Sequence, residues 1–212
     1  MVTLKLFVEG GGDAKTLRTA CRQGFTEFLK KYGLMHRPRI LACGSRRNAY
    51  DDFCTAVNNG EAAMLLVDSE AAIAADCQQG AAENWQPWKH LAQRPGDQWQ
   101  KPASAGDDQC HLMVQCMEAW FIADRATLKA FFGQGFKDNA LPPSSRPVDE
   151  VPKQQLYDSL KRATQRCKTK DVYGKGEHSF DLLARIDSKQ VEARSNWARR
   201  FLATIRKKMD GT

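Results

Sequence analysis

Residues 8–16 read VEGGGDAKT, and this stretch decides the fold. It begins at the end of the run LKLFVE, residues 4–9, which is typical of a buried strand, and its three glycines indicate a sharp turn into a helix. Two uses fit such a turn. In the first, backbone amides and Lys15 hold a phosphate; in the second, the turn presents Glu9 and Asp13 to a metal ion.

The spacing of the glycines argues against a bound nucleotide. A Walker loop needs Gly, four residues and then Gly-Lys-Ser/Thr, but counting back from Lys15 the two glycine positions hold Ala14 and Glu9. The dinucleotide pattern GxGxxG begins at Gly10 and Gly12 and then meets Lys15 where it needs a glycine. A plain strand-to-helix turn explains the glycines, but it does not explain an acid at the strand end.

The first 70 residues predict an α/β fold. Apolar residues at helical spacing run from Asp13 to Tyr32, followed by a strand in RPRILACGS, a helix in NAYDDFCTAVNNG and a strand in AAMLLVDSE. Short apolar strands that alternate with helices favour a mostly parallel sheet covered on both faces. Ligands bind at the carboxyl ends of such strands, which is where Glu9 and the 68–70 segment fall.

The remainder of the chain predicts an insertion and a helical tail. Residues 71–109 form an irregular excursion whose tryptophans anchor it to the body. CHLMVQ predicts a fourth strand and MEAWFIADRATLKAFFG a single helix, followed by helices near 153–167, 178–185 and 188–209. We therefore expect a core at 1–136 that carries the insertion at 71–109, and a linker with a C-terminal helical region at 137–212 packed on that core.

Composition limits the protein class. The chain has 212 residues, 42% hydrophobic and 27% charged, which suits one soluble domain. It lacks a run of about 18 apolar residues and begins without a leader pattern, so we expect a cytoplasmic protein with no membrane contact. Seven cysteines without a CxxC pair predict reduced thiols.

The net charge of +7 is concentrated in the last third of the sequence. From residue 151 onward there are fifteen Lys and Arg against seven Asp and Glu. Such asymmetry favours a nucleic acid as partner, although a solvated basic face gives the same pattern. The candidate phosphate contacts are Arg199, Arg200, Lys207 and Lys208. Arg46 and Arg47, just after the second strand, either hold a phosphate or lie in a solvated turn.

The acids suggest a metal site. Asp68 and Glu70 end a buried strand and point the same way by its two-residue period, which is costly unless a cation lies between them. Mg²⁺ prefers oxygen ligands of this kind. If the first and third strands are neighbours, Glu9 joins this pair. Asp13 either completes the site or caps the following helix.

These elements resemble the Toprim domain, in which a glutamate after the first strand and a later Asp-x-Asp or Asp-x-Glu pair bind divalent metal. VEGGGD and LLVDSE carry this resemblance. MVQCMEAWFIAD, with Glu118, is similar to the glutamate element of the nuclease branch, as in OLD and RloB-like proteins. The whole chain, including CGSRRNAYDDF and YGKGEHSFDLL, looks like a bacterial family, domain of unknown function 4276, whose members recur in proposed phage-defence loci.

The resemblance implies a Toprim endonuclease dependent on Mg²⁺ or Mn²⁺ that cuts DNA or RNA in an antiviral system. It implies Glu9, Asp68, Glu70 and Lys175 as catalytic residues, and Glu9, Asp13, Asp68, Glu70 and Glu118 as metal ligands. Glu70 departs from the aspartate of many Toprim domains. Lys175, flanked by glycines, either neutralises the phosphate in the transition state or is a solvent-facing loop lysine.

The resemblance also implies a partner. Small Toprim proteins of defence systems often resemble effectors held by an ATPase of the ABC or AAA type encoded nearby, and this chain lacks a Walker loop of its own. The alternative is therefore a non-catalytic, Toprim-shaped subunit that binds nucleic acid or regulates such an ATPase. Either form is compatible with a homo-oligomer.

Overall fold

A four-stranded parallel sheet forms the centre of the protein, which we describe from a computed structural model over residues 3–34 and 36–211. The strands are β1 (Lys5–Gly11), β2 (Arg39–Gly44), β3 (Ala63–Asp68) and β4 (Cys110–Met113), in the order β2-β1-β3-β4. The predicted parallel α/β sheet is confirmed, and β1 pairs with β3 as the metal-site argument required. The carboxyl ends of β1, β3 and β4 therefore open on one edge of the sheet.

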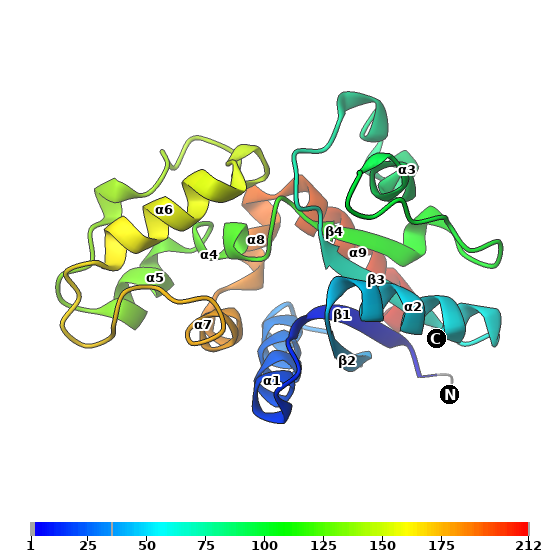
Figure 1. The fold of residues 1–212 in the computed structure, drawn as a ribbon, viewed down its shortest axis with the longest axis horizontal. Helices are drawn as coiled ribbons and strands as arrows, with labels where there is room; N and C mark the ends of the chain where they lie inside the picture. The colour runs from blue at the N-terminus through cyan, green and yellow to red at the C-terminus, as the bar shows by residue number, and fades with distance from the viewer. Residues whose placement is uncertain (1–2, 35, 212) are drawn as a thin grey trace.

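Helices cover both faces of this sheet (Figure 1). They are α1 (Lys15–Lys31), α2 (Arg46–Asn58), α3 (Pro87–Gln93), α4 (Glu118–Phe121), α5 (Arg125–Phe132), α6 (Lys153–Thr164), α7 (Ser179–Arg185), α8 (Ser188–Arg194) and α9 (Asn196–Asp210). Short 3-10 turns lie at Ala75–Cys77, Ala82–Asn84, Asp107–Gln109, Asp138–Ala140 and Val148–Glu150.

Successive residues of the central strands point into two separate apolar cores. Leu6 and Val8 of β1 lie in the core shared with α1, α7 and α9, whereas Phe7 between them lies in the core shared with α2 and the 71–109 excursion. This is the two-residue alternation of a strand, with both faces buried. The first core continues from Leu4 to Met209, so the C-terminal helices pack on the sheet rather than forming a separate body.

The excursion at 71–109 is held down by its tryptophans, as predicted. Trp88 and Trp99 are 3% and 4% exposed. The Trp88 indole N–H donates to the Gly106 carbonyl at 3.1 Å, and the Trp99 ring stacks on Tyr50 with centroids 4.6 Å apart. The helix α3 inside the excursion was not predicted, although Pro87 at its first position is a usual helix-start residue.

Two helices predicted as continuous are broken, and those predictions are wrong. The helix expected over 117–133 divides into α4 and α5, because Asp124 accepts hydrogen bonds from the Thr127 amide at 3.1 Å and the Thr127 hydroxyl at 2.7 Å. The helix expected over 188–209 divides into α8 and α9, where the Ser195 hydroxyl accepts from the Ala198 amide at 2.9 Å. Each side chain satisfies amides that begin a new helix, so a new helix starts there.

Candidate active site

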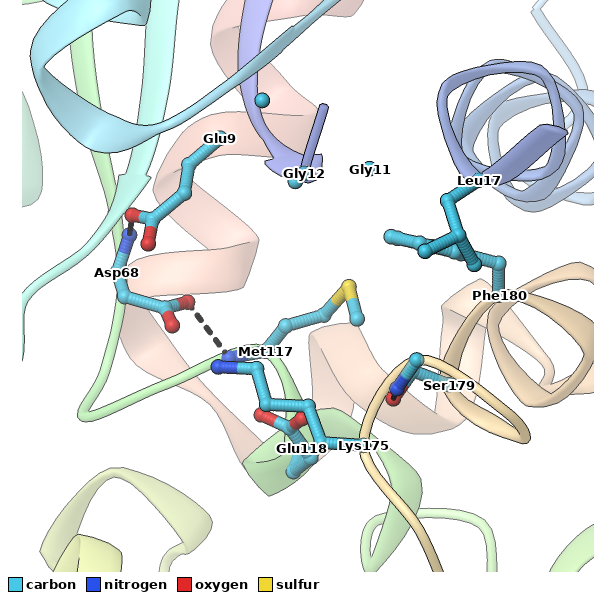
Figure 2. A pocket seen from close by; sticks show the side chains of 13 residues that line it. Glu9, Gly11, Gly12, Leu17, Asp68, Met117, Glu118, Lys175, Ser179 and Phe180 are labelled. Atoms are coloured by element: carbon cyan, nitrogen blue, oxygen red, sulfur yellow. Dashed lines mark hydrogen bonds between the residues drawn. The ribbon is translucent and has the colours of Figure 1, made fainter. Parts of the chain in front are cut away.

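Three carboxylates meet at the carboxyl edge of the sheet. Glu9 lies near the end of β1, Asp68 is the last residue of β3, and Glu70 follows two residues later. One oxygen from each of the three lies within 4.8 Å of the others. Figure 2 shows the side chains of Glu9 and Asp68 directed toward the same space. The expected convergence of these acids is present.

The path of the chain beyond β3 differs from the expectation. The strand ends at Asp68, and Glu70 has a φ of +63°, so its position does not follow from strand alternation. Instead, the Ser69 amide donates to the Met113 carbonyl at 2.9 Å and the Glu70 amide donates to the Gln115 carbonyl at 2.8 Å. The segment after β4 thus holds Glu70 against the other two acids.

The glycines of VEGGGD allow close approach of backbones. A Cβ atom on Gly11 would lie 2.7 Å from the Arg18 Cα atom, and one on Gly44 would lie 2.6 Å from the Gly12 carbonyl oxygen. Both glycines also have positive φ, at +87° and +81°. The turn therefore lets α1 and β2 pack tightly beside the acids, and the same glycines line the cavity at the site.

Asp68 is the most deeply buried of the three acids, at 3% exposed. Its Oδ1 accepts from the Met117 amide at 2.8 Å, and its own amide donates to Glu9 Oε2 at 3.1 Å. Burial raises the pKa of Asp68 well above its usual range, and the carboxylates of Glu9 and Glu118 raise it further. Burial also raises the pKa of Glu9, against the opposing effect of Arg46. A cation between them would relieve this cost.

Two basic side chains neutralise the outer part of the cluster. Arg46 Nη1 lies 3.1 Å from Glu9 Oε2, and its Nη2 lies 2.6 Å from Asp97 Oδ2. Arg46 also donates to the Asp68 carbonyl and lies over the Trp99 ring. Lys153, the first residue of α6, lies 2.5 Å from Glu70 Oε2. Although burial opposes it, this contact lowers the pKa of Glu70.

A cavity of about 290 Å³ extends from Glu9 and Asp68 to Glu118 and Lys175. Glu118 is fully buried; its Oε1 accepts from the Tyr173 hydroxyl at 3.1 Å, and its Oε2 has no hydrogen-bond partner among the described residues. Figure 2 shows Lys175 and Glu118 side by side at the lower end of this cavity. Desolvation lowers the pKa of Lys175, but the carboxylates of Glu118, Asp68 and Glu9 outweigh it and the net pKa is raised.

Several sequence candidates lie outside this cluster. The Asp13 side chain is fully exposed and 3.6 Å from Arg18, and it caps no helix, since α1 begins after Ala14 without a side-chain cap. Asp13 is therefore neither brought to the other acids nor used as the N-cap. Arg47 is exposed and pairs with Asp51 at 2.9 Å. Arg46 is committed to internal partners, so it is not placed as a free phosphate contact.

The basic residues of α9 are divided between the interior and the far edge of the sheet. Arg200 is 5% exposed and donates to the carbonyls of Ala82, Cys110 and Asp107, which makes it a structural residue. Arg199 is exposed. Lys207 and Lys208 lie beside Leu4 and Ala62, at the amino ends of the strands, and Lys208 pairs with Asp108. The acids lie at the opposite edge.

Lys153, Asp97 and Tyr173 contact the site but were not predicted from the sequence. Each comes from a different segment: Asp97 from the excursion, Lys153 from the start of α6 and Tyr173 from the loop before α7. Their partners in the site, Arg46, Glu70 and Glu118, are 51 or more positions away in the chain. No local pattern marks such residues, because only the folded chain brings them to the acids.

The donor set suits a hard divalent cation. It consists of three carboxylates that can each place an oxygen within 4.8 Å of the others. A fourth carboxylate, that of Glu118, has a buried oxygen without a hydrogen-bond partner among the described residues and lines the same cavity. Mg²⁺ and Mn²⁺ take ligands of this chemistry. Among the described residues, no other group of three or more acidic, histidine or cysteine side chains has this spacing.

The fold and the site define an α/β protein whose parallel sheet carries a carboxylate cluster at its carboxyl edge. The chain belongs to the family described as Domain of unknown function (DUF4276), whose model matches residues 8–206. Neither the comparison with curated proteins nor that with solved structures yields a match. No helix within the described residues combines the length and apolar character needed to cross a bilayer.

Proposed function

We propose that this chain is a Toprim-like nuclease that uses Mg²⁺ or Mn²⁺ to hydrolyse phosphodiester bonds of DNA or RNA. The observation that carries the proposal is the meeting of Glu9, Asp68 and Glu70 within 4.8 Å at the carboxyl edge of the sheet. The pairing of β1 with β3 supports the Toprim-like assignment, because it places a glutamate after the first strand beside the Asp-x-Glu pair after the third.

The carboxylates of Glu9, Asp68 and Glu70 would hold the metal, with Glu118 available as a further ligand from the cavity. When bound, a divalent ion lowers the pKa of an attacking water and stabilises charge on the leaving oxygen. Arg46 orients Glu9 through their 3.1 Å contact, and Asp97 in turn fixes Arg46. The acids are thus held in place by groups that do not themselves face the cavity.

Lys175 would act on the substrate rather than on the metal. Its raised pKa keeps the ammonium group charged at neutral pH, and the group lies at the cavity beside Glu118. A fixed positive charge there stabilises the additional negative charge that develops on the phosphate during hydrolysis. Gly12 lines the same cavity as Lys175, and a Cβ atom on Gly12 would meet no atom within 4 Å, which leaves room for a phosphate to approach the backbone.

The proposal includes a setting in antiviral defence with a partner ATPase. The family resemblance supports this setting, and the absence of a Walker loop in the sequence is consistent with an ATPase supplied by another chain. Two ion pairs favour the non-catalytic alternative, because Arg46 already neutralises Glu9 and Lys153 already neutralises Glu70. A regulatory subunit would need only this compensated cluster, whereas a nuclease must exchange at least the Lys153 contact for a metal.

Cleavage assays with labelled DNA and RNA in the presence of Mn²⁺ distinguish the two functions. We expect Asp68→Asn to abolish cleavage. Asp13→Asn is the matched control, because the Asp13 side chain is fully exposed and outside the cluster, and it should leave cleavage unchanged. The assay should be run alone and with any ATPase encoded beside the gene. If the wild-type system cleaves and Asp68→Asn cleaves equally well, the acids are not catalytic and the regulatory alternative replaces the nuclease.

A further inference from the structure

A basic segment spans the last turn of α6 and the start of the loop that carries Lys175. Residues 161–170 read KRATQRCKTK, with five Lys and Arg and no Asp or Glu. Lys161, Arg162, Arg166 and Lys168 are exposed, and Lys170 is partly covered by the Phe131 ring, 4.4 Å from its ammonium nitrogen. We call residues 161–170 the basic segment.

The charges of the basic segment are uncompensated. Within residues 3–34 and 36–211, none of its five cationic side chains forms an ion pair with a carboxylate. On α9, by contrast, Arg200 is buried, Lys208 pairs with Asp108, and the guanidinium of Arg206 lies 4.0 Å from the centre of the Tyr32 ring. Unpaired cations in one short stretch repel each other, and an anionic polymer bound across them removes that repulsion.

The backbone of the basic segment is held by the turn after α5. The Lys168 amide donates to the Gln134 carbonyl at 3.1 Å. A Cβ atom on Gly135 would lie 1.9 Å from the Arg166 carbonyl oxygen, so only glycine allows this approach. At the far side, the Tyr173 amide donates to the Thr164 hydroxyl at 2.8 Å. The segment is therefore a fixed platform, and a polar hollow of about 310 Å³ is lined by residues 167–171 together with Glu177 and His178.

The platform leads directly to the acids. Figure 1 shows the chain passing from the outer end of α6 along α5 to α7, which packs against α1 beside β1. Lys170 and Lys175 are five residues apart, so their Cα atoms are separated by at most about 18 Å. This is the length of about five phosphates along one strand of a duplex, at about 3.4 Å each. A strand with its scissile phosphate at Lys175 can thus reach the basic segment.

We propose that the basic segment binds the phosphate backbone of a nucleic acid and guides it to the acids. The inference deepens the proposed function and rests on it for the position of the scissile bond. The segment contains no aromatic or large aliphatic residue, whereas a protein partner usually needs such an anchor in its interface. Phosphate contact needs only exposed cations on a rigid support, which is what residues 161–170 supply.

Binding measured in EDTA tests the inference apart from cleavage. The patch variant is Arg162→Gln, Arg166→Gln and Lys168→Gln. The control variant is Arg22→Gln, Arg37→Gln and Lys189→Gln, which removes the same charge from exposed residues elsewhere. The probes are a fluorescent single strand, a fluorescent duplex and labelled poly-glutamate, each titrated over a range of salt concentrations.

We expect the patch variant alone to lose nucleic-acid affinity, by about 100-fold at 0.1 M salt, with a salt-dependence slope lower by about 2 to 3. Equal losses in both variants would overturn the inference, because only net charge would matter. If the wild type binds poly-glutamate tightly and the patch variant does not, the partner is an acidic protein and the inference is wrong. The inference is also wrong if the wild type does not bind nucleic acid. The assay contains no metal and measures binding rather than cleavage. Its result therefore tests the basic segment even if the protein proves not to be a nuclease.

Discussion

Replacing Asp68 with asparagine should stabilise the metal-free protein while removing its response to Mn²⁺. Asp68 is buried, and its carboxylate faces those of Glu9 and Glu118, both of which raise its pKa. Asparagine has nearly the same shape, and its carbonyl oxygen can still accept the hydrogen bond from the Met117 amide, which is 2.8 Å long in the wild type. The substitution therefore removes a buried charge without opening a cavity.

The size of the effect follows from the separation of the acids. Two like charges 4.8 Å apart, the span of this cluster, repel by about 3.5 kcal/mol at an effective dielectric constant of about 20. Protonation of Asp68 relieves part of this repulsion in the wild type. We expect the free energy of unfolding to rise by about 1–2 kcal/mol in Asp68→Asn, which raises Tm by about 2–8 °C for a chain of this length.

Mn²⁺ should reverse the order of the two proteins. At a metal concentration 100 times Kd, binding stabilises the wild type by about 2.7 kcal/mol, or about 5–11 °C in Tm. Asp68→Asn lacks the central ligand and should gain little. Wild type should thus melt below the variant in EDTA and above it in saturating Mn²⁺.

Thermal melts followed by circular dichroism, in EDTA and across a Mn²⁺ titration, measure both the metal-free stability and the stabilisation by metal. Asp13→Asn serves as control, because that side chain is fully exposed and should melt like the wild type in both conditions. An Asp68→Asn protein that is less stable than the wild type in EDTA would contradict the repulsion argument. An equal Mn²⁺ shift in both proteins would contradict the metal site.

Three further outcomes are expected. Arg200→Met should lower the free energy of unfolding by about 3 kcal/mol in urea melts, because three carbonyls, that of Cys110 fully buried, lose their donor. A loss no larger than that of exposed Arg199→Met would show that Arg200 is dispensable. Burial raises the pKa of Asp149 to about 6. The contribution of this carboxyl group to stability is therefore full below its unfolded pKa and is lost as pH rises through about 6. The unfolding free energy of the wild type relative to Asp149→Asn should fall by about 3 kcal/mol between pH 3 and 7. If the difference in unfolding free energy between the wild type and Asp149→Asn does not change with pH, the pKa of Asp149 is not raised. Lys175→Ala should slow cleavage about 100-fold with an unchanged Mn²⁺ midpoint, and a shifted midpoint would instead make Lys175 part of the metal site.

Local patterns in the sequence determine the sheet and the main acids. Apolar runs in the strands, glycines at the turn and acids at two strand ends are each visible within a few residues, and parallel pairing places the ends of neighbouring strands together. This reasoning predicts that Glu9 and Asp68 meet. The helix breaks at Asp124 and Ser195 were also readable, because both residue types favour N-caps, but the apolar spacing around them hid the signal.

Only the tertiary structure decided which charged residues serve the site. Arg199 and Arg200 are adjacent in sequence, yet Arg199 is exposed and Arg200 is buried. Successive residues of a helix point about 100° apart, so only Arg200 faces the sheet. Asp13 lies four residues from Glu9 and points to solvent, whereas Lys153 lies 83 positions from Glu70 and pairs with it. The charge of a side chain is a property of the sequence, but its partners are set by how distant segments pack, and local patterns carry no record of that packing.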